Sequence, residues 1–194
     1  MLTLEQIATE IGKTGPKTDK GSDVHDYFPF YEQQFAPIRD EPIKLLEIGV
    51  QTGSSILIWL EYFPNAKVFG VDIDPMKFPK SDRYTFVQGD QSKPEFWESF
   101  IASHGADWDV IIDDGGHMSG QIITSFNSLW PHVKPGALYI IEDLAQAYAP
   151  DFQTLGFLNH MDFIHELMHA INNGASAAES LLFSEELAII RKKG

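Results

Sequence analysis

The sequence predicts a doubly wound α/β fold with a mostly parallel sheet and a C-terminal antiparallel strand. From residue 43 onward, short β-prone runs alternate with helical runs, which is typical of a parallel sheet flanked by helices. Near the C-terminus this alternation stops, and two β-prone runs are separated by a short turn, as in an antiparallel hairpin. A length of 194 residues suits one such domain.

The predicted strands are short runs rich in aliphatic and β-branched residues, at 43–48, 67–72, 84–88, 108–113 and 137–141. The helices expected between them span 54–63, 94–103 and 119–130, and residues 75–78 form at most a short turn. A further helix is expected at 163–172, followed by a hairpin of 180–183 and 187–190.

The N-terminal part has a different character. Residues 13–23 have loop composition, and the aromatic segment 27–35 predicts a helix that covers part of the core. This segment could serve as a lid or as an interface of a homo-oligomer. We therefore expect a single domain over 1–194, with a cap or lid segment at 1–40 and the core at 41–194.

Composition excludes several classes of partner. The formal net charge of -14 disfavours nucleic acid and anionic membranes, because both attract clustered Lys and Arg. With no cysteine, the chain has no disulfide framework or thiolate site. The start Met1–Gly12 does not match a secretory signal, and no apolar run approaches the roughly 20 residues of a membrane span. The sequence thus predicts a cytoplasmic protein.

The segment 45–55 predicts a buried strand that runs into a glycine turn and then a helix. Gly49 and Gly53 would let the backbone approach a ligand at the helix N-terminus. A dinucleotide fingerprint would also need glycines where Gln51 and Ser54 stand, which disfavours a nicotinamide oxidoreductase.

Two carboxylates lie at the carboxyl ends of the next two predicted strands. Asp72 is placed to accept hydrogen bonds from ribose hydroxyls, and Asp90 is placed to meet an adenine amino group. Each residue alone could equally be a turn or helix cap. Their order and spacing after the glycine turn favour a nucleoside-binding site.

Two acidic clusters follow the fourth and fifth predicted strands: Asp113, Asp114 and His117, then Glu142 and Asp143. Since the carboxyl ends of neighbouring parallel strands share one edge, these side chains should face one crevice. A hard divalent cation such as Mg²⁺ would neutralise them, while helix capping is the simpler alternative. A zinc site at His160, His165 and His169 is disfavoured by the spacing of these residues.

Together these residues resemble the class I S-adenosylmethionine-dependent methyltransferases, whose fold is Rossmann-like. The resemblance is narrower to the metal-dependent sugar O-methyltransferases of macrolide and tetracenomycin antibiotic pathways. The motifs that carry it span nearly the whole chain and lie at 18–27, 46–53, 70–75, 88–91, 112–117, 134–136 and 141–144.

This resemblance implies the transfer of a methyl group from S-adenosylmethionine to a hydroxyl of a small molecule, such as a sugar or a glycosylated natural product. It implies that Mg²⁺ is bound by Asp114, Glu142 and Asp143, with His117 as general base. It assigns the cofactor contacts to seven residues: Lys20, Glu47, Gly49, Gly53, Asp72, Asp90 and Asp113. Lys20 belongs to an N-terminal element that, in the family, folds over the cofactor.

The chain departs from the family pattern at two places. Gly116 stands where relatives often have serine, and the connection 144–157, which helps to shape the acceptor site in such enzymes, is short. We also expect no counterpart of the additional N-terminal domain that some relatives carry. The alternatives are therefore a cephalosporin-hydroxylase-like relative, another small-molecule methyltransferase, or a cofactor-binding module without turnover.

Overall fold

A computed structural model describes residues 1–76 and 81–194, and its strands form one seven-stranded sheet in the order β3-β2-β1-β4-β5-β7-β6. The first five strands pair in parallel, whereas β7 is antiparallel to both β5 and β6. This arrangement confirms the predicted fold class. The strands are β1 Lys44–Ile48, β2 Lys67–Asp72, β3 Tyr84–Gln88, β4 Trp108–Asp113, β5 Val133–Ile141, β6 Ala178–Phe183 and β7 Ala188–Lys192.

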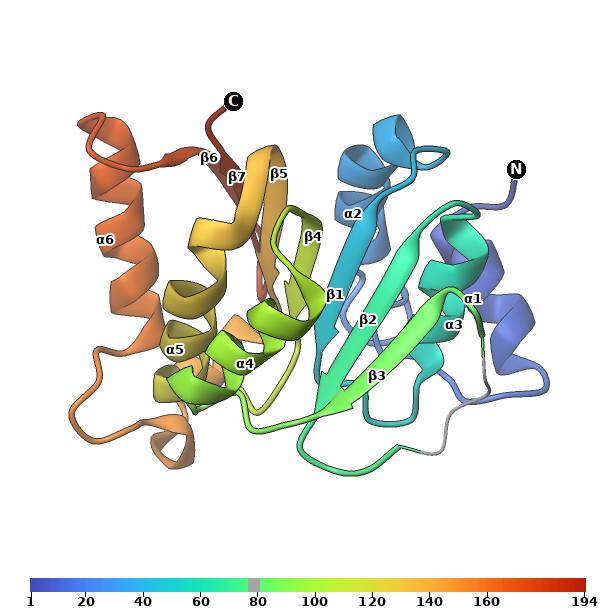
Figure 1. Cartoon of the computed structure of the whole chain (residues 1–194), viewed down its shortest axis with the longest axis horizontal. Helices are drawn as coiled ribbons and strands as arrows, with labels where there is room; N and C mark the ends of the chain where they lie inside the picture. The colour runs from blue at the N-terminus through green and yellow to red at the C-terminus, as the bar shows by residue number, and fades with distance from the viewer. Residues whose placement is uncertain (77–80) are drawn as a thin grey trace.

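Helices cover both faces of the sheet (Figure 1). One face packs against α1 Leu4–Gly12, α2 Phe28–Phe35 and α3 Ser54–Tyr62, and the other against α4 Pro94–His104, α5 Ser119–Leu129 and α6 His160–Asn172. Successive strand residues alternate between the two apolar clusters, because side chains of a strand point to opposite faces. The strands are therefore buried on both sides, as the continuous apolar runs in the sequence require.

The largest differences from the predicted boundaries lie in the C-terminal half. The strand β5 begins at Val133, four residues before the predicted start, and Pro135 and Gly136 lie where its pairing with β4 is irregular. The helix α6 begins at His160 because the Asn159 side chain caps it, accepting from the Met161 amide at 2.8 Å. Part of the turn predicted at 75–78 falls on residues 77 and 78, which lie outside the described residues.

The aromatic segment 27–35 forms the predicted helix and packs into the core. Tyr27, Phe28, Tyr31 and Phe35 are each at most 2% exposed. These four aromatic side chains therefore do not supply an oligomer interface, because they are already buried within the chain. Over the described residues, no helix is both long enough and apolar enough to cross a membrane.

His160 is fully buried, which contradicts the zinc alternative. Its Nδ1 lies 3.1 Å from the Ser119 hydroxyl and its Nε2 lies 3.3 Å from the Leu144 carbonyl oxygen, while His165 and His169 are exposed. The ring therefore joins the start of α5 to the start of α6 and to the segment after β5.

This environment predicts a pH dependence of stability. Burial lowers the pKa of His160 from its ordinary value of 6.5, so the folded state holds the ring neutral where the unfolded chain binds a proton. The stabilisation is present above pH 6.5 and is lost as the pH falls below it, by at most about 1.4 kcal/mol per pH unit. We expect His160→Gln to flatten this slope in urea unfolding between about pH 7 and 5. An unchanged slope would contradict the assignment, and His165→Gln is the exposed control.

Candidate active site

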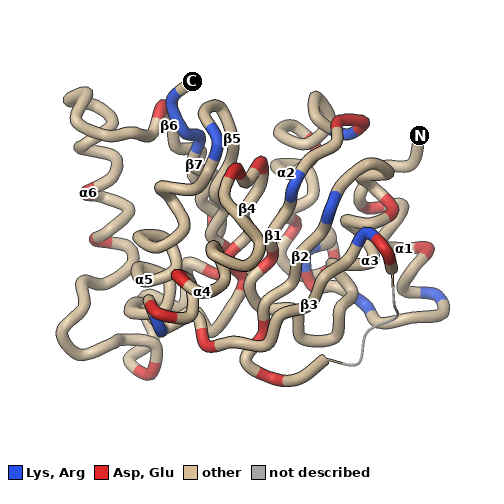
Figure 2. The backbone as a smooth tube through the Cα atoms, in the orientation of Figure 1, with Lys and Arg blue, Asp and Glu red and all other residues tan. Residues whose placement is uncertain are grey.

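The predicted site residues lie at the carboxyl-terminal edge of the parallel strands. Acidic residues gather along this edge, and Lys and Arg lie mainly toward the opposite edge (Figure 2). Two adjoining cavities open there, of about 200 and 190 Å³, and both are lined by Gly49 and Gln51 of the glycine turn. The edge therefore offers two connected binding compartments.

The first cavity is lined by Asp72 and Asp90, the two residues that the sequence analysis expects to bind a nucleoside. One carboxylate oxygen of Asp72 accepts the amide hydrogens of Val50 and Gln51, at 2.8 and 2.9 Å, which fixes the side chain against the glycine turn. Each carboxylate oxygen can accept two hydrogen bonds, so Asp72 keeps capacity for a ligand hydroxyl.

Asp90, the second carboxylate of the first cavity, is held by hydrogen bonds from Ser92. Partial burial pushes its pKa upward, but hydrogen bonds from Ser92 outweigh this effect and hold the pKa below its ordinary value. Asp90 therefore stays ionised and able to accept a hydrogen bond.

Gly49 is required by packing as well as by the turn. Its φ is +85°, and a Cβ there would lie 1.9 Å from the Asp114 carbonyl oxygen. Gly116 is also closely packed, because a Cβ there would lie 2.2 Å from Oε1 of Gln121. This Gln121 side chain caps the start of α5, so the glycine at 116 makes room for a flexible amide at the cavity wall.

Lys20 lies at the centre of a carboxylate cluster. Its side chain is 1% exposed, and its ammonium pairs with Asp114, with Glu142 at 2.5 Å and with Glu47 at 3.7 Å. Burial would lower the pKa of Lys20, but the three carboxylates, led by Asp114, raise it well above the ordinary value. The ammonium thus remains charged and draws the ends of β1, β4 and β5 together.

Glu142 uses both oxygens inside this cluster. One oxygen pairs with Lys20, and the other accepts a hydrogen bond from the Tyr31 hydroxyl of α2. Burial, together with the nearby Asp114, raises the pKa of Glu142 well above the ordinary value. Tyr31 and Lys20 together hold this carboxyl group away from solvent.

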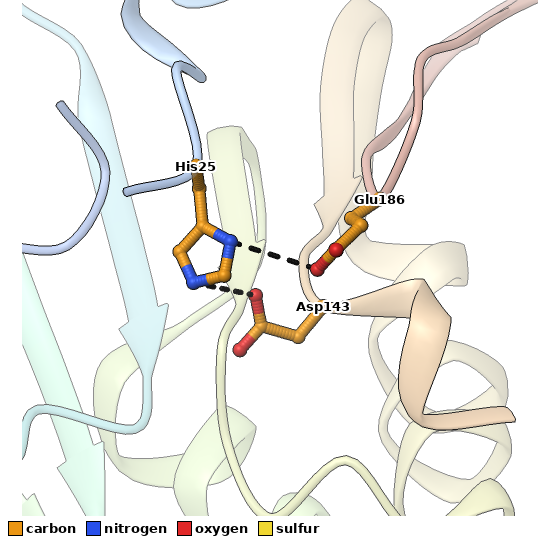
Figure 3. Close-up of side chains that lie close together, drawn as sticks. All are labelled: His25, Asp143 and Glu186. Atoms are coloured by element: carbon orange, nitrogen blue, oxygen red, sulfur yellow. Dashed lines mark ion pairs between the residues drawn. The ribbon is translucent and has the colours of Figure 1, made fainter. Parts of the chain in front are cut away.

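Asp143 lies between two histidines. Its Oδ2 is 3.5 Å from Nε2 of His117, and its Oδ1 is 3.8 Å from Nε2 of His25 and accepts a 2.8 Å hydrogen bond from Tyr27. His25 also lies 3.5 Å from Glu186, so one imidazole connects the N-terminal segment to the end of β5 and to the turn between β6 and β7 (Figure 3).

Three residues around the cavities have an unusual backbone conformation. Gln51, His117 and Asp143 have φ of 45°, 54° and 56°, the left-handed region that side chains rarely adopt. Such strained positions cluster at functional sites, because the surrounding structure must hold them in place. This conformation supports a functional role for the edge.

Three predicted cofactor residues, Glu47, Gly53 and Asp113, are buried and line neither cavity. Asp113 is 1% exposed, accepts hydrogen bonds from Gln91 and Tyr139, and lines neither cavity; burial raises its pKa to about 7. Its predicted contact with the cofactor stays a prediction, and its hydrogen bond with Gln91 positions a residue that does line the first cavity. Burial likewise raises the pKa of Glu47 to about 7, against the opposing effect of Lys20.

The donor set fits a hard divalent cation. Asp114, His117 and Asp143 offer ligand atoms within 4.8 Å of one another, and Glu47 and Glu142 add further carboxyl groups beside them. The single positive charge of Lys20 does not balance these groups when they are ionised. Oxygen-rich clusters of this kind suit Mg²⁺, which takes carboxylates together with water.

Local sequence patterns identified most of the residues at this edge but missed several contacts, among them Tyr31 with Glu142, Gln91 with Asp113, and Glu186 with His25. The position of Tyr31 could have been predicted from the sequence, because it follows Tyr27 by four residues and a helix places such residues on one face. The role of Glu186 could not have been predicted, since nothing in the sequence distinguishes it from an ordinary polar turn residue.

The sheet order, the antiparallel β7 and the cavity beside the glycine turn define the class I methyltransferase fold. Within that class, the chain belongs to the FtsJ-like methyltransferase family, which it matches over residues 29–146.

The chain is similar to antibiotic sugar methyltransferases. It is 34% identical to the 8-demethyl-8-alpha-L-rhamnosyl tetracenomycin-C 2'-O-methyltransferase of Streptomyces olivaceus, over 94% of this chain and 55% of that protein. It is 37% identical to the mycinamicin VI 2''-O-methyltransferase of Micromonospora griseorubida, over 70% of this chain and 35% of that protein.

A solved structure shows the same likeness. The MycE methyltransferase of the mycinamycin biosynthetic pathway, in complex with Mg, SAH and mycinamycin VI, has a TM-score of 0.88 and 30% identity, over 99% of this chain and 55% of MycE. The chain thus spans about half the length, or less, of the relatives it matches.

Proposed function

We propose that this chain transfers a methyl group from S-adenosylmethionine to a hydroxyl group of a sugar or a glycosylated small molecule, with Mg²⁺ bound at the acceptor side. The observation that carries the proposal is the pair of adjoining cavities: Asp72 and Asp90 line one, Asp114, His117 and Asp143 line the other, and the glycine turn lies between them. The named activities and the Mg and SAH of the relatives support it.

In the first cavity, the chain binds and orients the methyl donor. Asp72 and Asp90 accept hydrogen bonds from the nucleoside, and Gly49 and Gly53 place the turn beside the methionine part. S-adenosylmethionine supplies an electrophilic methyl group, so the task of the protein is to align the acceptor oxygen behind it and to exclude water.

In the second cavity, the chain prepares the acceptor. Asp114 and Asp143, with Glu142 behind them, would hold Mg²⁺, which when bound lowers the pKa of a hydroxyl group as a Lewis acid. His117 accepts the hydroxyl proton at its Nε2, and Asp143, 3.5 Å from that atom, stabilises the resulting imidazolium. An alcohol is a much weaker acid than protonated histidine, so the base and the cation are both needed.

The connection after β5 suits an acceptor with an apolar part. The Phe152 ring centre lies 6.5 Å from that of His117, and Tyr148 and Leu155 in the same connection are 77% and 103% exposed. These exposed side chains offer a surface for the part of the acceptor beyond its sugar. The net charge of -14 favours such a small molecule over nucleic acid.

The experiment is a calorimetric titration of S-adenosylmethionine into metal-free protein, with NAD as the control ligand, followed by Mg²⁺ and a screen of sugar diols for methyl transfer. Binding of S-adenosylmethionine but not NAD, a separate heat of Mg²⁺ binding, and methylated product support the proposal. Cofactor binding without turnover on any hydroxyl acceptor would favour the alternative of a binding module, and no cofactor binding would overturn the proposal.

Asp72→Ala tests the donor site directly. The substitution removes the acceptor for ribose hydroxyls and also releases the amides of Val50 and Gln51. Loss of hydrogen bonds to a charged group costs about 1.5–3 kcal/mol, so the Kd for S-adenosylmethionine should rise about 10- to 100-fold in the same titration. Asp74→Ala, at an exposed neighbour that lines neither cavity, is the matched control. An unchanged Kd in Asp72→Ala would contradict the assignment.

A further inference from the structure

The Lys20 ammonium occupies a position that suits a metal cation. It lies among Glu47, Asp114 and Glu142, it is fully buried, and it reaches them from the N-terminal segment across the ends of three strands. Two of its partners, Asp114 and Glu142, are also two of the three predicted Mg²⁺ ligands.

Lys20 and a metal ion would compete for the same carboxylate oxygens, as the contacts of Glu142 indicate. Its two oxygens are engaged by Lys20 and Tyr31, and its side chain is 1% exposed. A divalent cation bound to the same oxygens of Asp114 and Glu142 would lie within about 4 Å of the ammonium, where like charges repel strongly in a buried site. The described contacts therefore leave Glu142 little opportunity to coordinate a metal while Lys20 stays in place.

The long, flexible side chain of Lys20 would allow its ammonium to leave the carboxylates when a metal ion binds. Its four-carbon stem can swing the ammonium away from a site, and residues 13–23 around it form a loop rather than a regular element. Lys20 and its partner Asp114 both line the second cavity, which offers the side chain of Lys20 space to move into.

We propose that Lys20 is a built-in counter-cation that competes with the divalent metal ion for Asp114 and Glu142. In the metal-free protein the ammonium holds the carboxylates together, and the entering metal ion displaces it. Metal binding is thereby coupled to a rearrangement of the N-terminal segment. This inference rests on the proposed function only in assuming that these carboxylates take a divalent cation.

The first test compares Mg²⁺ and Mn²⁺ binding by calorimetry to wild type, Lys20→Met and Lys17→Met. Lys17→Met is the matched control, because Lys17 is an exposed residue of the same loop and its loss changes the net charge equally. Competition predicts that Lys20→Met binds both ions at least about tenfold more tightly than wild type, whereas Lys17→Met does not.

The second test uses wild-type protein, so it does not depend on the folding of a variant. Amine acylation followed by peptide mass spectrometry measures the reactivity of Lys20 with and without Mg²⁺, and exposed Lys17 is the internal reference. We expect Lys20 to be protected in metal-free protein and to react faster when Mg²⁺ is added. A Lys20 that stays equally protected in saturating Mg²⁺ overturns the proposal.

The outcomes separate this inference from the proposed function. If wild type binds Mg²⁺ and Lys20→Met binds it no more tightly, Lys20 is not a competitor, and the methyltransferase proposal stands. If neither protein binds a divalent cation while S-adenosylmethionine still binds, both the metal part of the proposed function and this inference fail.

Discussion

Replacement of His117 by Asn is expected to lower kcat for methyl transfer by about 10²- to 10⁴-fold, the usual contribution of a positioned general base. Asn is the best choice of substitute, because residue 117 has a φ of 54° and Asn tolerates this left-handed conformation better than most residues. The variant keeps the backbone and removes the group that accepts the proton.

The affinity for the donor should not change. His117 lines the second cavity and not the first, so calorimetry should give a Kd for S-adenosylmethionine close to that of wild type. His165→Asn, at an exposed position of α6, is the control and should retain full activity. A His117→Asn variant with unchanged kcat would remove His117 from the mechanism and leave Asp143 as the residue to test.

The arrangement of the strands could be predicted because it follows from local patterns. Each strand is a short apolar run, and Asp72, Asp90 and Asp114 lie at or just after the ends of three of these runs, so the rule that parallel strands end at one edge places them together. The same rule does not say which way a side chain points. Asp113 and Asp114 are adjacent in the sequence, yet Asp113 lies behind the cavities and Asp114 lines one of them.

The contacts of the N-terminal segment could not be predicted in this way. Lys20 meets Asp114 and Glu142, which are 94 and 122 positions further along the chain, and no local pattern specifies such a pairing. The sequence resemblance assigned Lys20 to the cofactor, whereas the structure pairs it with the carboxylates. The burial of Tyr27 and Tyr31 follows from the same packing of α2 and the segment before it over the edge of the sheet.

Replacement of Lys20 by Met should have the largest effect on the stability of the metal-free protein. The substitution leaves Glu47 and Glu142, both at most 1% exposed, without their cation, together with the partly buried Asp114. Removing one partner of a buried ion pair typically costs about 3–5 kcal/mol, so urea unfolding in the presence of a chelator should show a loss of this size. Lys17→Met should change the free energy of unfolding by no more than about 0.5 kcal/mol.

The loss of stability in Lys20→Met should depend on pH, and the ionisation of the buried carboxyl groups determines the direction of this dependence. Burial already raises the pKa of Glu47 to about 7, and Lys20 opposes this rise. Without Lys20, the pKa of Glu47 rises further. A carboxyl group whose pKa is raised in the folded state contributes stability at low pH, and this contribution is lost as the pH rises through the folded-state pKa. Lys20→Met should therefore lose more stability above pH 7 than below it. A loss that does not depend on pH would mean that the charge of Lys20 does not control the ionisation of Glu47.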